Sequence, residues 1–104
     1  ILITLTVWVA APAMADNPIR CNSSEECLIR GQNLFDGRGV KRDVDKARLY
    51  MAEACNKDYA PACFSLGRSY SDIVGEAEQG IPHYERACTL GLIEACNNVA
   101  VYLS

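Results

Sequence analysis

The chain has 104 residues, a net charge of −3 and 50% hydrophobic residues, which is enough for one small domain. Its most basic stretch, residues 41–48, interleaves two Lys and two Arg with two Asp. Such a mixed stretch excludes the basic footprint that binding of nucleic acid or an anionic membrane requires. We expect it to form a solvated helical surface.

Residues 1–15 are predicted to be a signal peptide that lacks its own first residues. They form an uncharged apolar run ending in Ala13-Met14-Ala15, a small-x-small cleavage pattern that makes Asp16 the first mature residue. The run is shorter than the roughly 20 apolar residues of a membrane-spanning helix, so no membrane anchor is expected after cleavage. The alternative is a buried N-terminal helix. We predict a secreted or periplasmic protein.

A first pair of helices is predicted downstream of this segment. Ser23 or Ser24 is a suitable N-cap, and apolar residues then recur three and four positions apart, as on one helix face. The glycine-containing turn at residues 36–39 ends this helix. Asp43 is the expected N-cap of the second helix, which closes near Asp58, where the following unit has a glycine.

A second pair of helices is predicted to follow. Pro61 falls in its first turn, residues 71–80 are expected to form an irregular acidic connector, and Pro82 is expected to start the second helix. The sequence then stops inside the first helix of a third unit, which predicts further repeats beyond Ser104. The repeat domain is thus expected at residues 16–104, with units at 26–59, 60–92 and 93–104.

Glycines at one register of the first helices predict a close approach between helices. Gly31 and Gly67 occupy the same place in their units, and Ala100 is the equivalent in the third. A glycine within a helix costs roughly 1 kcal/mol relative to alanine. Two glycines at one register therefore indicate that a neighbouring helix packs directly on the backbone.

Six cysteines follow the same repeat. Cys55 and Cys63 are eight residues apart, as are Cys88 and Cys96, and the second pair lies 33 residues beyond the first. A period of about 20–50 residues indicates a stacked-repeat architecture, and export would make the cysteines a disulfide framework. The first pair has only five intervening residues and departs from this spacing. The repeat register singles out the pairs Cys21–Cys27, Cys55–Cys63 and Cys88–Cys96.

Two segments resemble a known family. Residues 37–47, Gly-Arg-Gly-Val-Lys-Arg-Asp-Val-Asp-Lys-Ala, look like the inter-helix turn and second-helix start of SEL-one-like repeats, relatives of the tetratricopeptide helix pair. Residues 62–70, Ala-Cys-Phe-Ser-Leu-Gly-Arg-Ser-Tyr, are similar to the first helix of that family, and the Ala-Cys pairs to its secreted, cysteine-rich bacterial branch. The resemblance implies an all-α solenoid of helix pairs, linked by disulfides, that binds a protein or peptide without catalytic residues.

The same branch is also associated with penicillin binding and β-lactamase activity, so this is the alternative function. A serine β-lactamase needs a Ser-x-x-Lys motif, and the nearest approach, Ser65-Leu-Gly-Arg68, lacks the lysine. His83 is the only histidine, and the cysteine spacings are not those of zinc knuckles. We therefore expect no enzyme activity, metal or cofactor. A third possibility is an inert, disulfide-stabilised structural module.

The candidate binding surface is the concave side of the solenoid, which first helices usually line. The residues expected to line this side are polar and face solvent. The other interpretation is that they form only an ordinary solubilising surface. They are Arg30, Gln32, Asn33, Ser65, Arg68, Ser69, Asn97 and Asn98.

Overall fold

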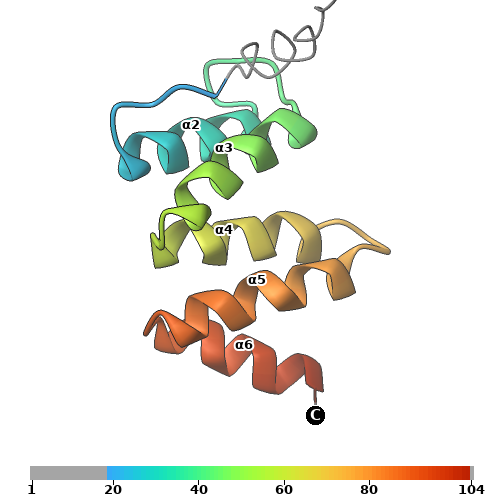
Figure 1. Cartoon of the computed structure of the whole chain (residues 1–104). Coiled ribbons are helices and arrows are strands. Elements are labelled where there is room, and N and C mark those ends of the chain that lie inside the picture. Colours follow the sequence, from blue (N-terminus) through green and yellow to red (C-terminus); the bar gives the residue numbers. More distant parts are fainter. Residues whose placement is uncertain (1–18, 104) are drawn as a thin grey trace, which may run out of the picture.

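Five helices stack in chain order in the computed structural model, which describes residues 19–103 (Figure 1). The predicted signal peptide and its cleavage site lie outside these residues. The described elements are α2 (Ser24–Asp36), α3 (Val44–Asn56), α4 (Ala60–Ser71), α5 (Ala77–Thr89) and α6 (Ile93–Leu103). Helices α2 and α3 form one antiparallel pair and α4 and α5 form the next, while α6 packs on α5. The described part is an α/α solenoid, as predicted.

The helix ends have the local causes that the sequence indicated. The side chain of Ser23 accepts a hydrogen bond from the backbone N–H of Glu26, and Asp43 caps α3 in the same way through Lys46. Gly37 ends α2 in the left-handed conformation, with a φ of 72°. Asp58 also has a positive φ, 65°, at the position that Gly91 occupies one repeat later.

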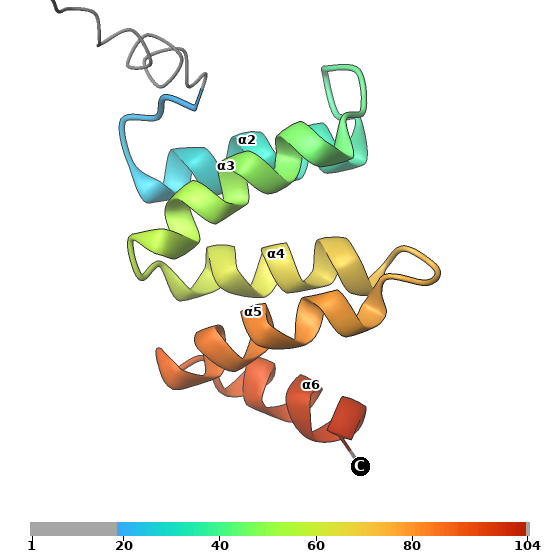
Figure 2. The same cartoon turned by 45° about the vertical axis from the view of Figure 1, so that its right-hand side comes forward.

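The connections alternate between the two ends of the helices. Figure 2 shows the α3–α4 and α5–α6 connections at one end and the α2–α3 and α4–α5 turns at the other. Disulfides close both connections of the first kind: Cys55 bonds to Cys63 and Cys88 to Cys96, with Cα–Cα distances of 4.6 and 4.7 Å. A third disulfide joins Cys21 to Cys27 at the start of α2. These are the three pairs that the repeat register singles out.

Small residues in the core let the helices approach closely. Five alanines are fully buried, and Met51, Leu66 and Tyr84 fill the spaces between them. A Cβ atom added at Gly31 would lie 2.8 Å from Cγ of Met51, and one at Gly67 would lie 2.9 Å from the ring of Tyr84. The expectation that both glycines mark close helix packing is confirmed.

The start of α5 differs from the prediction. Helix α4 continues through Ser71 and α5 already begins at Ala77, so the connector is only five residues long and Pro82 lies inside the helix. The reason is Gly80, where an added Cβ atom would lie 2.5 Å from the carbonyl oxygen of Gly67. This backbone contact holds the first turn of α5 against α4, although Pro82 cannot donate a helical hydrogen bond.

Candidate binding groove

Two neighbouring hollows lie along the first helices of the repeats. The first hollow, about 240 Å³, lies between α2 and α4 over Met51 of α3 and is lined by Gln32, Phe35, Ser65 and Arg68, among others. The second hollow, about 480 Å³, lies between α4 and α6 over Tyr84 of α5. Arg68 and Asp72 line both hollows, so the two are adjacent, and we refer to them together as the groove.

Five of the eight predicted binding residues line the two hollows, and the side chains of four of them are exposed or half-buried. Gln32, Ser65 and Arg68 border the first hollow, and Asn98 borders the second. The amide Nε2 of Gln32 donates a hydrogen bond of 3.2 Å to Oγ of Ser65, so α2 and α4 are bridged across the groove. These side chains carry hydrogen-bond donors and acceptors at the surface of the two hollows.

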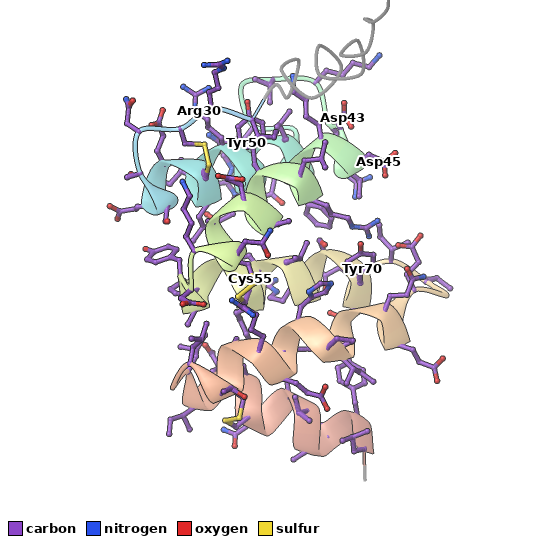
Figure 3. All side chains as sticks on the ribbon, in the orientation of Figure 1. Arg30, Asp43, Asp45, Tyr50, Cys55 and Tyr70 are labelled. Carbon is purple, nitrogen blue, oxygen red and sulfur yellow. A yellow bond between two sulfur atoms is a disulfide. The ribbon has the colours of Figure 1, made fainter. Side chains whose placement is uncertain are left out.

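Arg30 and Asn33 lie on a different side of α2. They line a separate depression together with Lys46 and Tyr50 of α3, and Figure 3 shows Arg30 beside Tyr50 at the outer end of the stack. Successive helical residues are rotated by about 100°, so Arg30 and Gln32 cannot share one face. Arg30 instead forms an ion pair of 2.9 Å with Glu26, one turn earlier.

That ion pair has a local electrostatic effect. The backbone N–H of Asn22 and the guanidinium of Arg30 both lower the pKa of the Glu26 carboxyl. The bond to Glu26 in turn raises the pKa of Arg30. Arg30 is therefore engaged with Glu26 of its own helix and with Tyr50 of α3 rather than in the groove.

Two further predicted residues differ from the expectation. Ser69 is only 1% exposed, so the prediction that it faces solvent is wrong. Its hydroxyl donates to the carbonyl of Leu66 and accepts from Nε of Arg48, so Ser69 lines the bottom of the first hollow with its hydroxyl already engaged. Asn97 is exposed on α6 and lines neither hollow.

Arg48 is a mostly buried residue next to the groove that the sequence did not indicate, because it lies in a stretch predicted to be solvated surface. Its side chain is 14% exposed and its Nη2 donates to the backbone oxygen of Ser69 at 2.6 Å and to Glu76 at 2.7 Å. The guanidinium also lies 3.8 Å from the ring centroid of Tyr70. Arg48 thus connects α3 to α4 and to the α4–α5 turn, and it holds Ser69, which lines the first hollow.

His83 belongs to the same cluster. Its ring stacks on Tyr70, with centroids 5.6 Å apart and an interplanar angle of 12°. Burial lowers the pKa of His83, and the positive charge of Arg48 lowers it further. His83 is thus a packed helix residue that favours its neutral form.

Aromatic rings form the base of the second hollow. Tyr84 lies 5.5 Å from Phe64 and 6.0 Å from Tyr102, measured between ring centroids, and its hydroxyl is 2.9 Å from Oγ of Ser71. Burial raises the pKa of Tyr84. The repeat could have identified this residue, because Tyr84 lies 33 positions after Met51, which forms the base of the first hollow.

The hydroxyl groups near the groove do not form a hydrolytic arrangement. Within residues 19–103, Ser65, Ser69 and Ser71 hydrogen-bond to Gln32, Arg48, Tyr84 and backbone carbonyls, and not to a lysine, histidine or carboxylate. A nucleophilic serine needs such a base within hydrogen-bonding distance. In the same residues no three His, Cys, Asp or Glu side chains are placed to hold a metal ion.

The chain is similar to a solved structure, cysteine-rich protein B of Helicobacter pylori. The two superpose with a TM-score of 0.63 and 32% sequence identity, over 73% of this chain and 59% of that one. The chain is a cysteine-rich SEL-one-like repeat protein. The helix pairs and the disulfides between them, expected from the resemblance, are those of this repeat type.

Two curated proteins are also similar to this SEL-one-like repeat protein. Cytochrome c oxidase assembly factor 7A of Xenopus laevis is 31% identical over 84 residues, and cytochrome c oxidase assembly factor 7 of Xenopus tropicalis is 34% identical over 88 residues. Each alignment covers 75% of this chain, and the chain spans 36% of the length of each of these relatives. No family model matches the sequence. Among the described helices, none has the length and apolarity needed to cross a membrane.

Proposed function

We propose that this protein is a non-enzymatic scaffold that binds an extended segment of a partner protein in the groove formed by the two hollows. The observation that carries the proposal is the adjacency of the two hollows across three first helices, each with polar side chains around an apolar base. Such a surface suits a peptide, because exposed amides and hydroxyls pair with its backbone while the base receives its side chains.

The comparisons support this class of function. The structural neighbour is a repeat protein of the same architecture, and helix-pair solenoids present extended concave surfaces for binding. The two Xenopus relatives are named as assembly factors for cytochrome c oxidase, which fits a repeat that contacts other proteins. No observation favours the β-lactam alternative.

An extracytoplasmic location is part of the proposal. Three disulfides within 85 described residues fit an oxidising compartment, since thiols stay reduced in the cytosol. The predicted cleavage after Ala15 would deliver the chain there. N-terminal sequencing of exported protein should start at Asp16, and an intact residue 1 on a cytoplasmic protein would contradict this.

A blocking substitution tests the groove. Gln32→Trp should place an indole in the first hollow and weaken capture of partner proteins by the oxidised chain. Arg30→Trp is the matched control, because it makes a similar change two residues away on a side of α2 that does not face the hollow. Equal capture by both variants would place the binding surface outside the groove.

A further inference from the structure

The two hollows occupy equivalent positions in consecutive repeats but differ in chemistry. Met51 at the base of the first is replaced by Tyr84 in the second, and Ser65 at the side is replaced by Asn98, each 33 residues later. Asp36 is the last residue of α2 and Asp72 is the C-cap of α4, so the two aspartates lie at the same register of their first helices. A bound segment therefore meets a similar shape twice, with different side chains.

The charges of the two hollows differ. Two arginines, Arg38 and Arg68, balance the two aspartates around the first hollow. Around the second hollow Arg68 alone faces the carboxylates of Asp72 and Glu94. The Arg68–Asp72 pair is loose, at 3.8 Å and largely exposed, and no ion pair within residues 19–103 engages Glu94. The second hollow therefore has an excess of negative charge.

Exposed aromatic surface accompanies this charge. Tyr102 is 40% exposed and stacks on the buried Tyr84, with an interplanar angle of 20°. A cation is attracted to the face of such a ring, and the attraction strengthens when carboxylates lie at the same site. Ring surface and carboxylates together match the aliphatic stem and cationic head of a lysine or arginine side chain.

We propose that the second hollow is a specificity pocket for a Lys or Arg side chain of the bound segment. This inference rests on the proposed function and names the chemistry of the partner.

Selection of random peptides on the oxidised full chain tests the pocket. Enriched peptides should share a Lys or Arg, and replacing it by Gln should weaken their binding. The double variant Glu94→Gln/Tyr102→Ala should weaken the binding of the enriched peptides by about tenfold, since an exposed ion pair and an exposed cation–π contact each contribute a factor of about two to five. The control Glu85→Gln removes an exposed carboxylate outside the hollows and should leave binding unchanged.

The outcomes separate this inference from the proposed function. If enriched peptides are blocked by Gln32→Trp but contain no preferred basic residue, the groove binds peptides and the basic pocket is wrong. If basic peptides bind the double variant as well as the wild type, the pocket is wrong as well. If no peptide is enriched, or if Gln32→Trp has no effect, the proposed function itself fails. Far-UV circular dichroism of the double variant controls for folding, and the single variant Glu94→Gln, which should also weaken binding, tests the pocket if the double variant unfolds.

Discussion

The contact between Gly67 and Gly80 allows a sharp test of how the second repeat is held together. A Cβ atom at residue 80 would lie 2.5 Å from the carbonyl oxygen of Gly67, whereas ordinary contact begins at 3.4 Å. The oxygen belongs to the backbone of α4 and cannot rotate away. Gly80→Ala therefore requires α4 and α5 to separate by nearly 1 Å where Gly80 and Tyr84 are both buried.

The net effect of Gly80→Ala on the free energy of unfolding is the difference between a gain in helix propensity and a cost of overpacking. Alanine favours the helix by about 1 kcal/mol relative to glycine, and overpacking of a well-packed core costs typically about 1–3 kcal/mol or more. Because the obstacle is backbone, we place the overpacking at the upper end and expect a net loss of about 1–3 kcal/mol in the free energy of unfolding. For a domain of this size each kcal/mol lowers Tm by roughly 4–8 °C.

Chemical and thermal unfolding of the oxidised protein, followed by far-UV circular dichroism, measures this loss. Gln79→Ala is the control, because it changes an exposed residue of the same helix and should shift stability by less than about 0.5 kcal/mol. A Gly80→Ala variant as stable as the wild type, or more stable, would refute the close packing of α4 on α5.

Four further variants, one of them a control, probe the rest of the structure. Arg48→Met should cost about 1–3 kcal/mol in urea unfolding, because mostly buried hydrogen bonds are lost. Arg38→Met, which removes only an exposed ion pair, should cost less than about 0.5 kcal/mol, and equal losses would contradict the role of Arg48. Stability should fall as pH drops below 6.5, since the lowered pKa of His83 lets the unfolded chain bind more protons. His83→Gln should flatten this pH dependence of stability. An unchanged slope of stability against pH would show that His83 is not its cause. Cys55→Ala/Cys63→Ala should cost roughly 2–3 kcal/mol by loop entropy, and non-reducing peptide mapping that links Cys55 to any other cysteine would overturn the repeat register.

Local features of the fold were predictable because their causes lie within a few residues. The caps at Ser23 and Asp43, the left-handed Asp58 and the close approach at Gly31 and Gly67 each follow from residue type and register. The start of α5 was not predictable, because Pro82 favours a helix start locally and the decisive contact comes from the backbone of α4. Tertiary packing outweighed the local preference.

The candidate site was predictable in part. Repeat register placed Gln32, Ser65 and Arg68 on one concave surface, but helical rotation carries Arg30 to another side. The burial of Arg48 depends on the α4–α5 turn, which lies 28 residues further along the chain at Glu76. No local pattern on α3 indicates that a guanidinium will be enclosed there.

Chemical-shift mapping by NMR tests the central claim, peptide binding in the groove, most directly. An enriched peptide would be titrated into the isotope-labelled, oxidised chain. We predict shift changes that follow the groove from Gln32 through Ser65 and Arg68 to Asn98, with the resonances of Arg30 and Lys46 unchanged. Shift changes confined to the depression around Arg30 of α2 and Lys46 and Tyr50 of α3, with none along the groove, would contradict the account.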